Sequence, residues 1–222
     1  MHRFRLDDLL SSADEMRQLS RILAGGGVAA IPTESSYGLA TSPLDESAVR
    51  RVFEIKGRDD GKPLLVLFAE RSQLAGLGVL EGPELDRFFD IWPAPLSVIF
   101  RIREPIPASK GTKTLAVRMP AIEEIRVLLR ETGPLTGTSA NRSGESPLND
   151  PAQVEASFGA NVDALVDGGV TPGRVPSTLI DATTDPPALL RTGDFGWPPE
   201  GWPAASGDGS EQNEVRPLKT DY

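Results

Sequence analysis

Short apolar runs alternate with amphipathic stretches along most of the chain, which is the pattern of strands interleaved with helices. Residues 12–24 have the signals of a helix. Ser12 and Glu15 stand three apart, as in a capping box at the start, and Gly25 follows as a stop. The same signals predict four further helices: about 45–55, one beginning at Pro83, one beginning at Pro120, and one beginning at Pro151 behind an Asp150 cap.

The apolar runs predict a series of short strands. In chain order these are 28–32, 64–68, 96–100, 115–119, 134–141 (running into a loop), 163–167, 177–181 and 188–191. Most of them are apolar throughout, which is typical of strands covered on both faces. The strands do not follow a simple βαβ repeat, so we expect an α/β layer structure with a mixed sheet.

The end of the chain differs in composition from the rest. After Thr192 the residues are mostly Gly, Pro, Ser and acids, so we expect residues 1–195 to form one folded domain and 196–222 to be a weakly packed tail. Trp197 and Trp202 are unusual in such a tail, and we expect them to hold its first part against the domain.

Composition excludes several kinds of chemistry. The chain has no cysteine, which rules out disulfides, thiolate nucleophiles and Cys-based zinc sites. Its one histidine, His2, stands on the expected N-terminal fringe, so a Ser-His-Asp triad and a histidine-rich metal site lack their central residue. The start has no apolar signal segment and no stretch has the length of a membrane span, which predicts a cytoplasmic protein with no membrane partner.

The formal net charge of −9 argues against non-specific coating of nucleic acid. Residues 196–222 hold five acidic and two basic residues, which is −3 of the −9 and leaves −6 on the body. A local basic groove remains compatible with that balance.

Two stretches in the first third of the chain could bind a polar ligand. "IPTESSYGL" (31–39) places hydroxyls at Thr33, Ser35, Ser36 and Tyr37 on a loop after a buried strand, although a plain polar turn fits it equally well. "KGRDDGKPL" (56–64) gathers three cations that suit phosphate or carboxylate, or that form an ordinary solvated loop: Lys56, Arg58 and Lys62. Neither stretch is a P-loop.

Later stretches add further candidates. "TGTSANRSG" (136–144) could surround an anion with hydroxyls and backbone amides, or form an ordinary Ser/Asn turn. Arg118 in an apolar strand, with Ser177 and Arg191 at the ends of two others, would add to an anion site. Ser139 is a poor nucleophile candidate because no histidine can activate it.

In order and spacing these stretches resemble the YrdC-type threonylcarbamoyl-AMP synthases. The resemblance runs from about residue 14 to 195 and rests on seven segments: PTESSYG (32–38), KGRDDGKPL (56–64), WPAPLS (92–97), VRMP (117–120), SANRSG (139–144), STLID (177–181) and RTG (191–193). Each segment alone is a weak signal, whereas all of them in the family's order form a strong one.

The resemblance implies a twisted open mixed sheet with flanking helices and a concave, positively lined cavity in a catalytic domain spanning 1–195. It implies that L-threonine, bicarbonate and ATP, with Mg²⁺, give threonylcarbamoyl-adenylate and pyrophosphate. The product would supply the threonylcarbamoyl modification of tRNA adenosine through separate transfer proteins, and the chain itself would bind tRNA at most weakly. The reaction needs no enzyme nucleophile, only cations that hold two anionic reactants together, which suits a chain with a single histidine.

By position, the resemblance assigns roles to individual residues. Lys56 and Arg58 would be catalytic. The threonine site would contain Thr33, Ser35, Tyr37, Arg118 and Ser177. The nucleotide site would contain Arg58, Lys62, Ser139, Asn141, Ser143 and Arg191. No protein side chain is assigned to a metal.

The chain departs from the family pattern mainly in the first loop. Ser35 and Ser36 stand where the family usually has Thr and Val, so fewer methyl groups would surround the amino acid. One methyl group discriminates by only ~1–3 kcal/mol. Two other functions are compatible with the same residues: an RNA-binding or ribosome-maturation module, and a carbamoyl-adenylate-forming relative with a different acceptor.

Overall fold

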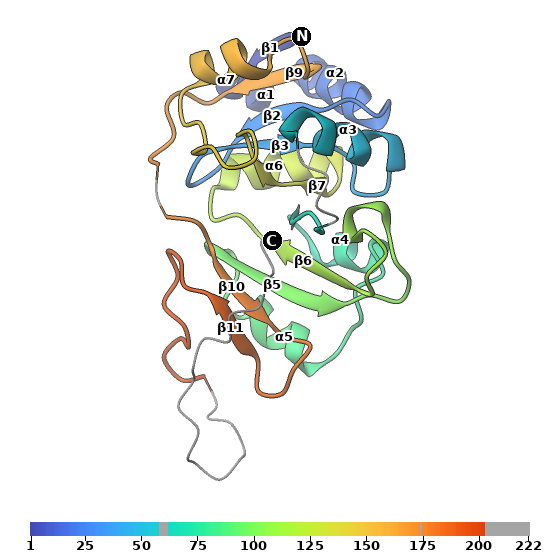
Figure 1. The fold of residues 1–222 in the computed structure, drawn as a ribbon, viewed down its shortest axis with the longest axis vertical. Coiled ribbons are helices and arrows are strands. Elements are labelled where there is room, and N and C mark those ends of the chain that lie inside the picture. The colour runs from blue at the N-terminus through green and yellow to red at the C-terminus, as the bar shows by residue number, and fades with distance from the viewer. Residues whose placement is uncertain (58–61, 174, 203–222) are drawn as a thin grey trace.

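The strands of the protein are divided between two sheets, one above the other in Figure 1, and helices pack against both. The computed structural model describes residues 1–57, 62–173 and 175–202. The first sheet has the order β1-β9-β2-β3-β8, with bounds His2–Arg5, Ala164–Asp167, Ala29–Pro32, Tyr37–Ala40 and Thr138–Ser139. The second has the order β11-β10-β5-β6-β4-β7, with bounds Ala188–Arg191, Thr178–Asp181, Leu96–Arg101, Thr114–Arg118, Val66–Leu67 and Leu135–Thr136.

Both sheets are mixed. In the first, β2 runs parallel to β9 and antiparallel to β3, and in the second, β5 runs parallel to β10 and antiparallel to β6. The predicted α/β class with a mixed strand order is therefore confirmed, with two sheets in place of the single sheet that was expected.

Gly137 marks the place where the chain passes from the second sheet to the first. The predicted strand 134–141 is split there into β7 and β8, which belong to different sheets. A Cβ at Gly137 would lie 2.6 Å from Cγ of Leu67, so a side chain at this crossing would collide with β4. The two sheets are thus brought close together at one glycine.

Several helices begin at side-chain caps that the sequence provides. The helical elements are α1 (Leu6–Ser11), α2 (Ala13–Ala24), α3 (Glu46–Lys56), α4 (Arg71–Gly76), α5 (Pro83–Phe89), the 3-10 turn η1 (Pro107–Ser109), α6 (Glu123–Thr132) and α7 (Pro151–Phe158). Ser12, Asp45 and Asp150 each accept a backbone N–H of the first turn, as predicted for the first and third of them. The helix expected from Pro120 begins instead at Glu123, because Ile122 is extended and the N–H of Ala121 donates to Glu34.

The strand β2 is buried on both faces, which explains why it is apolar throughout. Ala29 and Ile31 face a cluster that also contains Leu19 of α2 and Leu128 of α6. Val28, just before β2, and Ala30 belong to the larger cluster on the other face, together with Val52 of α3. Burial of such aliphatic side chains is worth ~1.5–3 kcal/mol each and fixes the helices against the sheet.

Both ends of the described chain pack against the rest of the protein. The expectation that His2 belongs to a terminal fringe is wrong, because His2 to Arg5 pair in parallel with Ala164 to Asp167 of β9. At the other end, Trp197 stacks on Phe88 with ring centroids 5.7 Å apart, and Trp202 lies 5.3 Å from the same ring. This confirms that the two tryptophans hold the first part of the predicted tail, whose remainder from 203 lies outside the described residues.

In the part of the chain that the structure describes, no helix has both the length and the apolar character that a membrane crossing requires.

Candidate active site

A cavity of about 430 Å³ lies where the two sheets meet. The first sheet contributes the loop after β2, the start of β3 and the strand β8. The second contributes the ends of β6 and β11 and the residues just before β10. The segments between them complete the wall with Pro63 to Leu65, Ser146, Pro147, Asn149, Gly173 and Pro176. Polar groups from two separate sheets therefore face a single hollow.

Seven of the predicted site residues line this cavity. They are Thr33, Ser35, Tyr37, Arg118, Ser139, Ser177 and Arg191. These residues come from positions up to more than 150 apart in the sequence, and the fold brings them to one cavity, while their roles stay predictions.

The hydroxyl loop 33–36 is a tight turn between β2 and β3. The backbone N–H and the hydroxyl of Thr33 both donate to the carbonyl of Ser36, at 3.0 and 2.7 Å. The turn leaves Ser35 and Ser36 on the cavity wall. Thr33 thus shapes the loop, and the two serines offer hydroxyls to a ligand.

Tyr37 is an anchor of the wall. Its buried hydroxyl donates to the carbonyl of Gly169 at 2.8 Å and accepts the N–H of Gly168 at 3.1 Å. Burial raises the pKa of the Tyr37 phenol to about 12, so the group stays protonated near neutral pH. Its position ties β3 to the segment that leads from the first sheet to the second.

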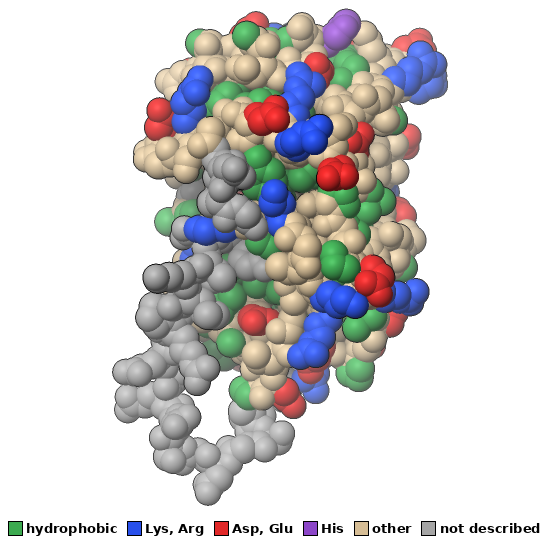
Figure 2. Space-filling view, turned by 45° about the vertical axis from the view of Figure 1, so that its right-hand side comes forward, with side chains coloured by type: hydrophobic (Ala, Val, Ile, Leu, Met, Phe, Trp, Pro, Cys, Tyr) green, Lys and Arg blue, Asp and Glu red, His purple; other side chains and the backbone are tan. Residues whose placement is uncertain are grey.

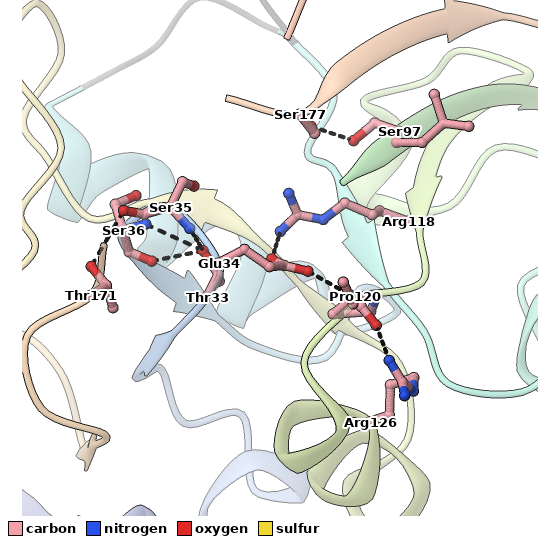
Figure 3. Close-up of polar contacts among 12 residues, drawn as sticks. Thr33, Glu34, Ser35, Ser36, Ser97, Arg118, Pro120, Arg126, Thr171 and Ser177 are labelled. Atoms are coloured by element: carbon pink, nitrogen blue, oxygen red, sulfur yellow. Dashed lines mark hydrogen bonds and ion pairs between the residues drawn. The ribbon is translucent and has the colours of Figure 1, made fainter. Parts of the chain in front are cut away.

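Arg118 is the last residue of β6. Its guanidinium lies at the cavity, with the carboxylate of Glu34 beside it. Figure 3 shows the side chain reaching from the second sheet toward the 33–36 loop. Nη2 of Arg118 lies 3.4 Å from Oε2 of Glu34, and the side chains are 6% and 11% exposed. Arg118 is therefore buried at the cavity, as a contribution to an anion site requires.

A second guanidinium, that of Arg191, lines the same cavity. Its Nε and Nη2 donate to the carbonyl of Ser177 at 3.2 and 3.1 Å, and the hydroxyl of Ser177 bonds that of Ser97 at 2.8 Å. Burial lowers the pKa of Arg191, and the positive charge of Arg118 lowers it further. Two arginines that affect each other electrostatically make the cavity suited to anions.

The segment that carries Arg191 is fastened by Thr178. The Thr178 hydroxyl accepts the N–H groups of Gly193 and Phe195, at 3.0 and 3.2 Å, and donates to the carbonyl of Phe195 at 2.6 Å. A Cβ at Gly193 would lie 2.2 Å from the carbonyl oxygen of Pro176, so only glycine fits at this crossing. The STLID and RTG segments are therefore in direct contact.

Lys56 supports the wall from within the protein. The residue is 3% exposed, and its ammonium donates to the carbonyl of Ser139 and, at 3.0 Å, to Oδ1 of Asn141. Asn141 also accepts the Ser139 hydroxyl at 2.6 Å and donates to the carbonyl of Glu145 at 2.7 Å. These bonds hold the SANRSG segment in shape, with Ser139 facing the cavity.

The remaining predicted residues stand around this wall. The N–H of Ser143 donates to the carbonyl of Lys56 at 3.0 Å, and Lys62 immediately precedes Pro63, a lining residue. Arg58 lies outside the described residues. The binding and catalytic roles assigned to these residues and to Lys56 and Asn141 stay predictions.

Sequence reasoning gave no role to several residues of the site. Thr138, Ser146 and Asn149 line the cavity, as does Ser36, which the resemblance did not assign to either substrate. Glu34 was read within the PTESSYG segment without a function of its own. Thr138 could have been found from its place beside Ser139, whereas nothing in the local sequence around Asn149 indicates that it reaches the cavity.

The protein surface has charges of both signs on the face shown in Figure 2. Figure 2 shows Lys and Arg side chains interspersed with Asp and Glu on the face in view. Among the described residues, no three His, Asp or Glu side chains gather as a metal site would require. The site is thus a cavity with arginines and hydroxyls.

Comparison with known proteins shows which family has a similar sequence. The Sua5/YciO/YrdC family, described as "Telomere recombination", matches residues 21–193. A protein of Pyrococcus abyssi named threonylcarbamoyl-AMP synthase is 39% identical over 184 residues, which cover 78% of this chain and 53% of that protein. A protein of the same name from Thiobacillus denitrificans is 39% identical over 170 residues, which cover 75% of this chain and 90% of that protein.

The solved structures agree with the sequence comparison. The crystal structure of Pyrococcus abyssi Sua5 complexed with L-threonine superposes with a TM-score of 0.75 at 34% identity, covering 86% of this chain and 57% of that one. The chain therefore spans about half the length of the Pyrococcus relative and nearly all of the Thiobacillus one. With its cavity built from the expected segments and most of its length matched, the chain belongs to the Sua5/YciO/YrdC family.

Proposed function

We propose that the protein is a threonylcarbamoyl-AMP synthase, a nucleotidyltransferase that converts L-threonine, bicarbonate and ATP into threonylcarbamoyl-adenylate and pyrophosphate. The observation that carries the proposal is the shared cavity, which Arg118 and Arg191 line from one sheet and the 33–36 loop lines from the other. Family members with this name and a relative complexed with L-threonine support the choice of substrates.

In the proposed reaction, the amine of threonine and bicarbonate form a carbamate with loss of water. A carbamate oxygen then attacks the α-phosphorus of ATP, and the bond to pyrophosphate breaks. Both reactants are anionic, so the main tasks of the protein are to hold them together and to offset the charge that develops on the phosphoryl oxygens. Arginines in a partly buried cavity are suited to both tasks.

The residues divide between the two substrates. Arg118, with the loop residues Thr33, Ser35 and Tyr37 and with Ser177, would take the amino acid, whose carboxylate matches the planar guanidinium fork. Arg191, Ser139, Asn141, Ser143 and Lys62 would take the nucleotide, with Arg58 from outside the described residues. Lys56 would act by holding Ser139 and Asn141 in place as well as by its charge.

The metal in this proposal is Mg²⁺ that enters with ATP as part of the substrate. Carboxylate groups of the kind that hold a resident ion are not gathered in the described part of the chain. The arginines of the cavity would share the neutralisation of the phosphates with the ion.

The product would be consumed by separate proteins that transfer the threonylcarbamoyl group to tRNA. The alternative of an RNA-binding module has less support, because basic and acidic side chains alternate on the face shown in Figure 2 and the net charge is −9. A relative that carbamoylates another acceptor would share the adenylate chemistry but not the dependence on threonine.

Pyrophosphate release tests the proposal. The protein is incubated with MgATP, bicarbonate and L-threonine, and each reactant is omitted in turn. We expect release to require all three, and L-serine to replace threonine with a loss of ~10–100-fold, because one methyl group sets the difference. Release that does not depend on the amino acid would reject a threonine-dependent synthase, and binding of tRNA without any pyrophosphate release would favour the RNA-binding function.

A further inference from the structure

The carboxylate of Glu34 faces away from the turn that carries it. Glu34 stands between Thr33 and Ser35, which both line the cavity, yet its own side chain lies against the end of β6. Its Oε1 accepts the N–H of Ala121 at 2.6 Å, and its Oε2 faces Nη2 of Arg118 at 3.4 Å (Figure 3). The carboxylate is therefore fixed at one oxygen by the backbone and presents the other to the arginine.

The ion pair is buried but incompletely bonded. Charge-assisted N–H···O bonds are commonly ~2.7–2.9 Å long, so 3.4 Å is a loose contact. Oε2 of Glu34 and Nε of Arg118 are both buried, and neither has a hydrogen-bond partner in the described part of the chain. Buried charged groups normally have their bonding capacity filled. The guanidinium thus has its charge balanced while it keeps bonding capacity for a ligand.

A second arginine adds positive charge beside this ion pair. Arg191 lines the same cavity, and its pKa is lowered in part by the charge of Arg118, so the two guanidinium groups are close enough to repel each other. Arg191 donates to the carbonyl of Ser177. Glu34 places a negative charge beside Arg118.

From this geometry we propose that Glu34 is a positioning residue for substrate: it orients the guanidinium of Arg118 before binding and yields it to the carboxylate of the amino acid. The inference rests on the proposed function for the identity of that carboxylate. Glu34 acts through Arg118 and does not itself touch the substrate.

Two measurements on the full chain test the proposal. The first is the ¹⁵N–¹H NMR signal of the Arg118 Nε–H group without any ligand, assigned by its loss in Arg118→Lys. In the wild-type protein we expect a heteronuclear NOE typical of rigid backbone, and in Glu34→Gln a lower value that reports a mobile guanidinium. Gln keeps an acceptor for the Ala121 N–H, so the loop itself is preserved.

Glu81→Gln is the matched control, because it weakens an exposed ion pair with Arg71, neither residue lines the cavity, and the change should leave the Arg118 signal unchanged. Glu34→Asp keeps the charge on a shorter side chain and should restore part of the order, which provides a second variant if Glu34→Gln does not fold. An Arg118 signal that is equally rigid in wild type, Glu34→Gln and Glu34→Asp would overturn the positioning role.

The second measurement is calorimetric titration with L-threonine in a double-mutant cycle. We expect Glu34→Gln to weaken binding by about tenfold or more in the wild-type background and by less than about twofold in Arg118→Ala. Equal losses in both backgrounds would overturn action through Arg118, and so would unchanged affinity in Glu34→Gln. If wild-type protein binds no threonine, the proposed function fails, and the NMR comparison still decides whether Glu34 orients Arg118.

Discussion

The ammonium of Lys56, at the end of α3, lies 3.0 Å from Oδ1 of Asn141, in the loop that follows β8. The same ammonium donates to the carbonyl of Ser139, and the side chain is almost fully buried. One lysine thus fastens the segment that presents Ser139 to the cavity. This gives a mechanical reason for the KGR and SANRSG segments to occur together.

Removing this lysine should affect both activity and stability. We expect Lys56→Ala to lower kcat/KM by ~10²-fold, since charge-assisted bonds worth ~2–3 kcal/mol are lost. The free energy of unfolding should fall by ~1–3 kcal/mol, because buried acceptors lose their donor. Steady-state pyrophosphate kinetics and urea denaturation measure the two effects.

The control for Lys56 is Lys113→Ala, which removes an exposed lysine paired with Glu104. It should change the free energy of unfolding, and the activation free energy calculated from kcat/KM, by no more than ~0.5 kcal/mol each. Wild-type kinetics in Lys56→Ala would show that the fastening is dispensable and that the lysine has no catalytic role.

Gly193 should be irreplaceable for a steric reason. Its missing Cβ would lie 2.2 Å from the carbonyl oxygen of Pro176 and 2.4 Å from the carbonyl carbon of Ser177. We expect Gly193→Ala to push apart the segment that carries Arg191 and to lower kcat/KM by at least about tenfold, with a loss of ~1–3 kcal/mol in stability. Gly196→Ala is the matched control, since a Cβ there meets no described atom within 4 Å. Equal behaviour of the two variants would contradict the close crossing of these segments.

The aromatic contacts at Phe88 should stabilise the segment after β11. The ring of Trp197 stacks on Phe88 at an interplanar angle of 12° and lies 4.7 Å from the ring of Trp202. Because Trp197 is half-buried, we expect Trp197→Ala to cost ~2 kcal/mol of unfolding free energy, below the range for fully buried aromatics. Leu44→Ala, at a side chain 52% exposed, should cost much less. A melting temperature of Trp197→Ala equal to that of wild type would mean that the stacking does not hold the segment.

Tyr37 should give the protein a specific sensitivity to alkaline pH. Its pKa is raised from 10.0 to about 12 by burial. Between pH ~10 and ~12 the folded form keeps the Tyr37 proton while the unfolded form loses it. The contribution of Tyr37 to the free energy of unfolding is therefore complete below pH ~10 and is lost as the pH rises toward ~12. The difference of two pKa units sets an upper bound of ~2.7 kcal/mol on this loss of unfolding free energy.

The Tyr37 effect can be read from phenolate absorbance and from denaturation across pH 9–12. Tyr37→Phe should remove the ionisation step near pH 12 and flatten the loss of unfolding free energy above pH 10. A wild-type titration in which the step absent from Tyr37→Phe falls near pH 10 would contradict the buried hydroxyl.

The local signals of the sequence predicted five of the helices and most strands, because caps and apolar runs act over a few residues, whereas the six-residue helices α1 and α4 were not predicted. Ser12 and Asp150 are caps in the structure, and α2 ends at Ala24 as Gly25 predicted. The strands β7 and β8 are only two residues each, too short to have a periodicity, so their assignment to different sheets could not be foreseen. The strand β3 was hidden because it follows a polar turn without an apolar run of its own.

For the site, too, local sequence motifs were informative and long-range contacts could not be predicted. The ordered motifs predicted which segments meet, and residues such as Arg118 and Arg191 do share a cavity. Side-chain direction could not be predicted, since it depends on contacts between distant segments. Lys56 turns toward Ser139, and Glu34 turns away from its neighbours in the loop toward Arg118.

The most direct test of the account is the identity of the product. The protein is incubated with ¹³C-bicarbonate, L-threonine and MgATP, and the nucleotides are examined by mass spectrometry. The account predicts an adenylate that contains threonine and one labelled carbon, formed in equal amount with pyrophosphate and strongly reduced in Arg118→Ala but not in Arg103→Ala, an exposed arginine. Pyrophosphate without a labelled threonine adduct, or an adduct formed equally well by Arg118→Ala, would contradict it.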